Sequence, residues 1–274
     1  MRKFCKIQKA YWCFTKTGFK TAIAYRSELI GYFIGESLYN IALIFVWKAL
    51  FLNTGNTAYN GFTFTQIVLY LLLSGIMSFM DESDSLFILG EEIRDGNIVM
   101  RLIKPVSLDK SILYFELGNK LLMLTCVFVP SVVFVGIYFN FAYGITFPVS
   151  SYVLFSLSMI ISYFISFYFN MLFGFLSFYL LNLWGVSMLK TAVVKFLSGQ
   201  VIPLFLFPEI VEKVFSILPM AAMTYTPVMI FLGKYSRRVL LFNLAVQIFW
   251  LFFFYSICQI IWKRVQHKLM VQGG

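Results

Sequence analysis

The chain has 274 residues, of which 60% are hydrophobic and 12% are charged, and its formal net charge is +10. A soluble domain is about 45–50% apolar, so this composition excludes a soluble globular protein and predicts an integral membrane protein. The positive charge does not call for a nucleic acid as partner. Basic segments beside the anionic lipid of a cytoplasmic membrane surface account for it.

The first 26 residues predict a basic amphipathic helix that lies in the membrane surface. Two interpretations stay open for this helix. It is either a simple anchor in membrane lipid or an anchor that also contacts a cytoplasmic partner. On a helical wheel the apolar and basic side chains take opposite sides, with Phe4, Ile7, Tyr11 and Phe14 against Arg2, Lys6, Lys9, Lys16 and Lys20.

Six apolar segments predict spanning helices, because about 20 residues at 1.5 Å each cross the hydrocarbon core of a bilayer. Polar links at 53–62 and 139–148 separate some of these segments. A charged segment at 81–110 separates the second span from the third, and a proline-broken region at 207–235 precedes the last. The predicted spans are residues 28–52, 63–80, 111–138, 149–180, 187–206 and 238–262.

Basic residues predict the orientation of the chain. Residues 1–26 contain seven Lys and Arg, residues 90–110 contain four, and the links at 53–62 and 139–148 contain none. The positive-inside rule therefore places both termini and the charged segment in the cytoplasm, which agrees with six spans. Four basic residues fall on the outer side against the rule, and two acidic residues offset part of their charge: Lys213, Lys234, Arg237 and Arg238 against Glu209 and Glu212.

The sequence contains no motif of a catalytic or nucleotide-binding site. Its single histidine is His267, and its four cysteines have neither the spacing of a metal site nor that of a disulfide framework. The glycine-rich loop that cradles ATP phosphates, G-x-x-x-x-G-K-[ST], does not occur. We therefore expect neither an enzyme nor a chain that binds a cofactor. If its function uses ATP, another polypeptide binds the nucleotide.

Charged side chains inside the spans are costly and therefore informative. Glu36 lies near the middle of the first span. Two interpretations stay open for it: a partner on a neighbouring helix, or a role in a substrate path. Glu116 and Lys120 lie four residues apart, so they can pair on one face of the third span.

Further charges lie at the predicted cytoplasmic ends of spans. Lys190 and Lys195 lie at the start of the fifth span. An acidic cluster ends the second span and is expected to form a solvated face: Asp81, Glu82 and Asp84.

The charged segment at 81–110 contains a predicted short helix. LFILGEEIRDG, residues 86–96, places Gly96 where a helix commonly stops, and Arg94 can pair with Glu91 one turn back. Pro105 then ends the following piece, IVMRLIKP. A short amphipathic helix at a membrane surface is a good docking site for a soluble partner, and a plain surface loop is the alternative.

Two stretches of the sequence resemble a known family. EEIRDGNIVMRLIKPVS, residues 91–107, is similar to the cytoplasmic segment of the ABC-2 type permeases of bacterial ABC exporters, in their compact six-span branch. LSGQVIPLFLFPEIVEKVFSILPMAAMTYTPVMIFLGK, residues 197–234, resembles the segment after the fifth span in the same branch. The resemblance implies an all-α membrane protein with a cytoplasmic helix at 1–26 and a permease domain at 27–274.

In that family the N-terminal helix and the loop between spans two and three contact the ATPase subunit, and the loop contains a coupling helix. By resemblance, the ATPase-coupling residues of this chain are Glu91, Glu92, Arg94, Asp95 and Gly96.

The resemblance also implies short re-entrant helices on the outer side of the membrane. Four prolines divide residues 203–235 into pieces too short to span. Irregular backbone at membrane depth must be buried in protein or line a cavity, which makes this region a candidate outer gate. The prolines are Pro203, Pro208, Pro219 and Pro227.

The implied function is that of the permease subunit of an ATP-driven exporter in a bacterial cell membrane. Its partners are an ATPase that binds ATP and Mg²⁺ and a second permease, either another copy or a related chain. A non-transporting membrane sensor or scaffold that recruits a cytoplasmic partner is the alternative function.

Overall fold

A computed structural model describes residues 2–54, 58–59, 61–81, 83–103, 106–180 and 182–272. Within these ranges the side chains of 2–7, 54, 59, 102 and 266–272 are not described. Glu82 and Pro105, part of the predicted acidic cluster and of the charged segment, lie outside the described residues. Nearly all of the described chain is helical, and its only strands form a hairpin with two residues on each side, β1 (Ala58–Tyr59) and β2 (Phe62–Thr63).

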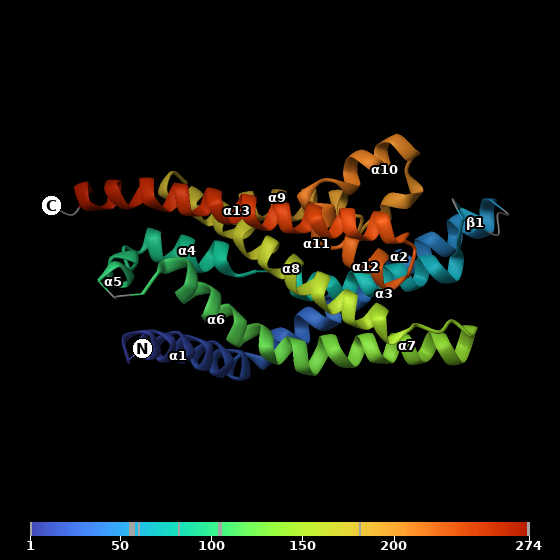
Figure 1. Ribbon diagram of the computed structural model, residues 1–274, viewed down its shortest axis with the longest axis horizontal. Coiled ribbons are helices and arrows are strands. Elements are labelled where there is room, and N and C mark those ends of the chain that lie inside the picture. Colours follow the sequence, from blue (N-terminus) through green and yellow to red (C-terminus); the bar gives the residue numbers. More distant parts are fainter. Residues whose placement is uncertain are drawn as a thin grey trace.

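The helices follow one another in a bundle that is elongated along one axis (Figure 1). η1 is a π-helical turn, and η2 and η3 are 3₁₀ turns. In chain order the helices are α1 Arg2–Ala24, α2 Arg26–Thr54, α3 Phe64–Asp81, α4 Ser85–Arg94, α5 Ile98–Leu102, α6 Leu108–Met123, η1 Leu124–Phe128, α7 Val129–Tyr143, α8 Val149–Gly174, η2 Phe175–Phe178, α9 Trp184–Leu197, η3 Leu204–Leu206, α10 Glu209–Ser216, α11 Pro219–Met223, α12 Tyr225–Phe231 and α13 Arg237–Gln272.

The prediction of an all-α membrane protein is confirmed. Among the described residues, five helical segments are long and apolar enough to cross a bilayer. They correspond to α2, α3 with α4, α6 with η1 and α7, α8 with η2, and α13. Their bounds are Arg26–Asn53, Phe64–Arg94, Leu108–Tyr143, Val149–Phe178 and Arg237–Val265.

The fifth predicted span, 187–206, is not one long helix. Its helix, α9, has 14 residues, so it is about 21 Å long at 1.5 Å per residue. Gly199 follows with a φ of 79°, a left-handed conformation that favours glycine, and Pro203 then precedes η3. These two residues end the helix before it reaches the length of a span.

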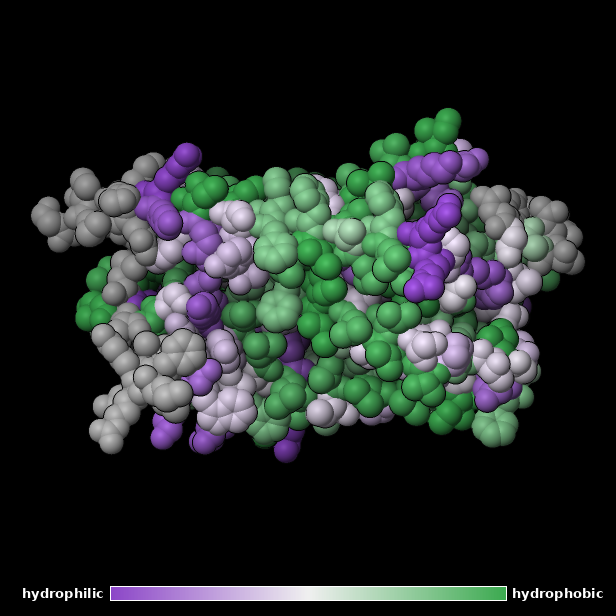
Figure 2. Space-filling model, in the orientation of Figure 1, coloured by the Kyte–Doolittle hydropathy of each residue, from purple (hydrophilic) through white to green (hydrophobic). Residues whose placement is uncertain are grey.

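The two ends of the chain nevertheless lie at the same end of the bundle, on the left in Figure 1. Five crossings would leave them at opposite ends. The segment formed by α9 and η3 therefore makes the sixth passage along the bundle. Figure 2 shows a broad apolar band over the middle of the visible face and hydrophilic surface toward both ends, as expected for a chain that spans a bilayer.

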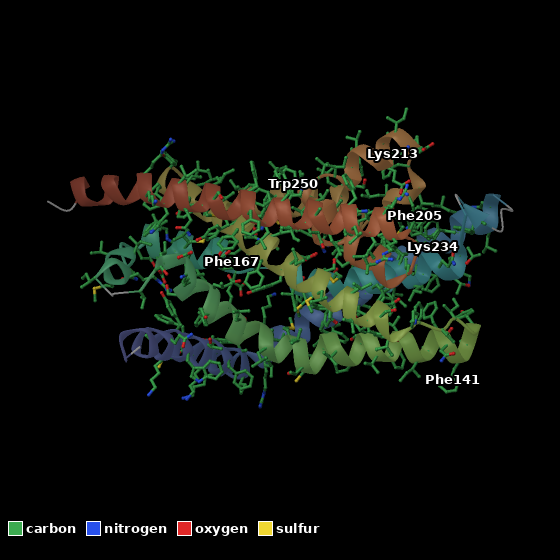
Figure 3. All side chains as sticks on the ribbon, viewed as in Figure 1. Phe141, Phe167, Phe205, Lys213, Lys234 and Trp250 are labelled. Carbon is green, nitrogen blue, oxygen red and sulfur yellow. The ribbon has the colours of Figure 1, made fainter. Side chains whose placement is uncertain are left out.

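Two buried hydrophobic clusters hold the bundle together. One lies toward the opposite end from the termini, where α3, α7, α8, α12 and η3 meet, and it includes Phe205. The other lies toward the terminal end, where α4, α6, α8, α11 and α13 meet, and it includes Phe167 (Figure 3). Most of α3 and α8 is buried, whereas α2 and α13 are mostly exposed. The bundle is therefore built around α3 and α8.

The N-terminal helix α1 packs along α6. Gly18 and Gly118 form the closest contact, because a Cβ atom on either one would lie 2.0 Å from a backbone oxygen of the other helix. The Tyr11 ring stacks on the Tyr114 ring at 5.0 Å between centroids, and the hydroxyls of Tyr11 and Ser107 are hydrogen-bonded at 2.9 Å. The predicted helix is present, but part of its apolar side covers α6 rather than lipid.

Replacing Gly118 by leucine is expected to separate α1 from α6. The new side chain would begin 2.0 Å from the Thr15 carbonyl oxygen, and backbone cannot move aside as a flexible side chain can. Overpacking of this kind costs about 1–3 kcal/mol. We expect a lower Tm and faster tryptic cleavage after Lys16 in the purified protein.

Gly35→Leu is the matched control, since a Cβ atom at Gly35 meets nothing within 4 Å. This variant should be cleaved like the parent. If the Gly118 variant is also cleaved like the parent, the close packing of α1 on α6 is wrong.

Candidate functional site

The first candidate site is the pair of short helices α4 and α5, which lie at the terminal end of the bundle (Figure 1). α4 is amphipathic, as predicted. Leu86 and Leu89 are fully buried on one side, where α4 packs on α8 and η2. Glu91, Arg94 and Asp95 are exposed on the other side. One face of α4 is therefore fixed to the bundle, and its charges face away from it.

Gly96 ends α4, as predicted from the sequence. Its φ is 73°, and its backbone N–H donates to the Ile93 carbonyl oxygen at 3.2 Å. A left-handed residue at this position is a common helix stop, and glycine adopts it without steric cost. The turn reverses the chain into α5.

α5 presents an exposed apolar tip. Ile98 is buried and attaches the helix to the bundle, whereas Met100 is 62% exposed and Ile103 73% exposed. Val99 is exposed beside them. We call Val99, Met100 and Ile103 the α5 tip. Exposed apolar side chains beside a charged rim are typical of a surface that binds another protein.

An ion pair that sequence reasoning missed braces the two helices. The Arg101 guanidinium on α5 donates to both carboxylate oxygens of Glu92 on α4, and its Nη1 donates to the Ser111 hydroxyl on α6 at 2.7 Å. The predicted pairing of Arg94 with Glu91 is wrong, because Arg94 Nε donates to the Asp95 carboxylate at 3.1 Å. Glu92 therefore supports the segment, and Glu91, Arg94 and Asp95 form its exposed rim.

The second candidate site is a set of polar side chains inside the membrane-spanning bundle. Glu36 on α2 is buried, and its carboxylate lies 3.2 Å from the Lys195 ammonium on α9. The Ser78 hydroxyl on α3 donates to the same carboxylate at 3.0 Å. The Lys195 ammonium also lies 4.9 Å from the centre of the Tyr39 ring. Glu36 thus has a partner on a neighbouring helix, which was the first of the two interpretations given for it from the sequence.

Asp81 does not belong to a solvated face, in contrast to the prediction. It is buried at the end of α3, where its Oδ2 accepts a hydrogen bond from the Thr224 hydroxyl at 2.6 Å. Gln200 Nε2 donates in turn to the Thr224 oxygen at 2.9 Å. The prediction failed because Thr224 lies 143 residues away in the chain. Asp84, three residues further on, is exposed as predicted.

A polar cavity of about 100 Å³ adjoins Asp81. Lys190 and Lys195 on α9 line it, together with Asn170 on α8. The Lys190 ammonium donates to the Asn170 amide oxygen. Cationic, anionic and amide groups therefore meet where α3, α8 and α9 approach one another, near the terminal end of the bundle.

Glu116 and Lys120 do not pair with each other, which corrects the sequence prediction. Both carboxylate oxygens of Glu116 lie within hydrogen-bonding distance of the Ser83 hydroxyl, at 2.8 and 3.0 Å. The Lys120 ammonium donates to the Phe79 carbonyl oxygen at 2.8 Å. Ser83 lies between α3 and α4, so both charged residues of α6 hold the point where α3 turns into α4.

The four predicted prolines lie at short helices. Pro203 and Pro208 precede η3 and α10, Pro219 begins α11, and Pro227 lies in the first turn of α12. A proline lacks the N–H that continues a helix but fits its first turn. The region therefore consists of short pieces, as predicted.

A buried glutamine satisfies the backbone where α11 breaks before α12. Gln247 on α13 donates through Nε2 to the Ala222 carbonyl oxygen at 2.8 Å and to the Ser162 hydroxyl at 3.0 Å. Its Oε1 accepts from the Ser158 hydroxyl at 2.9 Å. Broken helices are tolerated at membrane depth only where neighbouring side chains satisfy the freed groups. An amide within an apolar stretch of α13 was the sequence signal for this contact.

The opposite end of the bundle carries an exposed ion pair on α10, where Figure 3 labels Lys213. The Lys213 ammonium lies 2.6 Å from the Glu209 carboxylate one turn earlier, and it lowers the pKa of that carboxyl. Nearby, the Lys234 ammonium lies 4.5 Å from the centre of the Phe62 ring, which stacks on Phe205. Aromatic contacts thus hold the region after Pro203 to the β1–β2 hairpin.

Comparison with protein families identifies the chain. The family model described as ABC-2 family transporter protein matches residues 38–273. The chain belongs to the ABC-2 transporter family. Comparison with curated proteins gives no match. The match covers most of α2 and every later helix, and α1 precedes it. As a member of this family, the chain is a multi-pass membrane protein with a general permease role.

Replacing Lys195 by methionine is expected to destabilise this ABC-2 family protein. Breaking a buried ion pair costs about 3–5 kcal/mol, and we expect about 2–3 kcal/mol here because the Lys195 side chain is 27% exposed. The measurement is thermal unfolding of the purified protein. Adding Glu36→Gln should restore most of the loss, since no unpaired charge then remains.

Lys213→Met is the matched control, because it removes a lysine from an ion pair that is exposed on both sides. Its unfolding curve should overlay that of the parent. A Lys195 variant as stable as the parent would show that the pair with Glu36 does not support the fold.

Proposed function

We propose that the chain is the permease subunit of an ATP-driven exporter, coupled to a separate ATPase and paired with a second permease. The observation that carries this proposal is the arrangement of buried and exposed side chains on the α4–α5 segment. One face of it is fixed to the spanning helices, and the other face offers an apolar tip and a charged rim. A soluble partner that binds the tip can therefore move the spans.

The contacts of the segment define a route for that movement. Force on α5 passes to α4 through Arg101 and Glu92, and to α6 through Ser111. From α4 the force reaches Ser83 in the turn between α3 and α4, which we call the α3–α4 elbow. The Glu116 carboxylate accepts a hydrogen bond from Ser83 there. ATP shifts such a system only if the two states differ in these contacts. ATP and Mg²⁺ bind to the partner ATPase in this proposal.

A second permease, another copy or a related chain, supplies the other wall of the substrate path. α2 and α9 expose large apolar side chains along their lengths, among them Phe45 on α2 and Leu189 on α9. Burial of such faces against a like chain encloses a path between the two permeases. The proline-broken region from Pro203 onward lies at the far end and acts as the outer gate.

The distribution of basic residues gives the proposed orientation of the chain in the membrane. Seven Lys and Arg residues in 1–26 and four in 90–110 put α1 and the α4–α5 segment on the cytoplasmic side of a bacterial cell membrane. The α5 tip then faces the compartment in which ATP is available. The short helices after Pro203 face outward.

Met100→Glu is expected to weaken ATPase binding and to reduce export without loss of membrane insertion. A hot-spot side chain at an interface is worth about 2 kcal/mol or more, so we expect at least tenfold weaker co-purification of the ATPase. Arg94→Glu, which reverses a rim charge, and Gly96→Pro, which distorts the α4 stop, should act in the same direction. Pull-down of the ATPase and export are measured in the same cells.

Ile210→Glu on α10 is the matched control. Ile210 is an apolar side chain on a short helix, as Met100 is, and it is 78% exposed. It lies at the opposite end of the bundle. This variant should bind the ATPase like the parent. Parental ATPase binding and export by the Met100 variant would refute the proposed coupling.

Single-cysteine labelling in intact cells tests the orientation. A cysteine at Lys213 should react with a membrane-impermeant maleimide, and a cysteine at Asn97 should react only after the cells are opened. Both residues are exposed and lie outside the long helices, so reactivity reports the compartment. The reverse pattern would overturn the topology and with it the position of the ATPase.

A further inference from the structure

An apolar groove of about 520 Å³ runs between the start of α2 and the junction of α6 with η1. Ile30 and Phe33 form its wall on α2, and Cys126 and Val127 form its wall on η1. Arg26 lies in the lining of the groove, where α2 begins. The volume is that of a small-molecule site, which is commonly about 300–1,000 Å³.

The lengths of the two helices place this groove at the edge of the membrane. α2 has 29 residues and the segment Leu108–Tyr143 has 36, whereas about 20 residues cross the hydrocarbon core. The charged residues of the segment Leu108–Tyr143 lie between Asp109 and Lys120, so we infer that the excess lies at that end, where α1 packs on α6. Arg26 therefore lies at the level of lipid headgroups, and Phe33 and Val127 lie deeper, at the level of acyl chains.

The π-helical turn shapes one wall of the groove. Pro130 has no N–H, so the carbonyl of Cys126 loses the helical partner that residue 130 would supply. The chain widens into η1 over the five residues that precede α7, and the Thr125 hydroxyl donates to the Leu121 carbonyl oxygen at 2.9 Å. The wall thus has a fixed, irregular form rather than the regular surface of an α-helix.

The charge in the lining of the groove is positive, since Glu28, two residues after Arg26, lines the neighbouring pocket instead. Within the part of the chain that the structure describes, Arg26 forms no ion pair, and no acidic residue lines the groove. Lys16 and Lys20 are exposed on the adjoining α1. A guanidinium at headgroup level is well suited to a phosphate, because its planar donors match the phosphate oxygens.

We propose that this groove is a binding site for an anionic phospholipid of the cytoplasmic leaflet. The phosphate binds Arg26, and one acyl chain lies along Ile30, Phe33, Cys126 and Val127. Zwitterionic lipid fits the apolar part equally well, so the preference for anionic lipid comes from Arg26 and the basic surface of α1. The lipid bridges α2 and α6 at the point where α1 joins α2.

The test uses the full chain, reconstituted in vesicles of equal parts phosphatidylcholine and phosphatidylglycerol. Native mass spectrometry then measures which lipid stays bound after mild detergent extraction. We expect the parent to retain phosphatidylglycerol in preference. One basic residue near an anionic surface contributes about 1 kcal/mol, so Arg26→Gln should lower the retained phosphatidylglycerol about fivefold. It should lower phosphatidylcholine less, because the choline group offsets the charge of its phosphate.

Two further variants complete the experiment. Arg237→Gln removes an exposed arginine at the opposite end of the bundle and should retain phosphatidylglycerol like the parent. Cys126→Trp fills the groove and should lower retention of both lipids. The proposal is overturned if the parent retains both lipids equally, if Arg26→Gln retains phosphatidylglycerol like the parent, or if Arg237→Gln loses as much.

Discussion

Lipid supplies no hydrogen-bonding partner, so a buried polar side chain on the long helices is stabilised when another part of the protein supplies one. α3 is the centre of this constraint. Ser78 on α3 donates to Glu36 on α2, and Asp81 accepts from Thr224 in the proline-broken region. The Phe79 carbonyl accepts from Lys120 on α6. Three elements distant in sequence are thereby bound to one helix, and the α3–α4 elbow has little freedom to move independently of them.

Apolar packing alone would not specify these contacts, because lipid tails are as apolar as the aromatic side chains that fill the two clusters. Small residues add specificity where helices approach closely. Gly75 on α3 leaves room for the Asn40 side chain of α2, and Gly18 faces the backbone of α6 at Phe115. A side chain at Gly18 would separate the helices, and a side chain at Gly75 would displace the Asn40 side chain. Polar pairs and glycine contacts thus determine how neighbouring helices are aligned, which the packing of phenylalanine side chains alone does not determine.

The sequence alone was enough to predict the long helices, the Gly96 stop and the short pieces after Pro203, because length, hydropathy and proline act locally. The sequence was not enough to predict which residues pair with the buried charged side chains. Lys195 and Glu36 are 159 residues apart, and only the folded bundle brings them together. Asp81 was expected in water because a carboxylate at the end of a span usually is. The shortness of α9 had a visible signal in Gly199 and Pro203, which a search for apolar residues alone passes over.

The two ends of the bundle are connected through a short stretch of chain at the elbow. Asp81 accepts a hydrogen bond from Thr224, which lies between α11 and α12. Ser83, two residues after Asp81 and just before α4, donates to Glu116. A displacement of α4 must therefore carry Ser83 and Asp81 with it or break their hydrogen bonds. Close-packed interiors change between discrete arrangements rather than deforming continuously. In the proposed function, a shift of α4 at one end and a rearrangement of the short helices beyond Thr224 are for this reason parts of one transition.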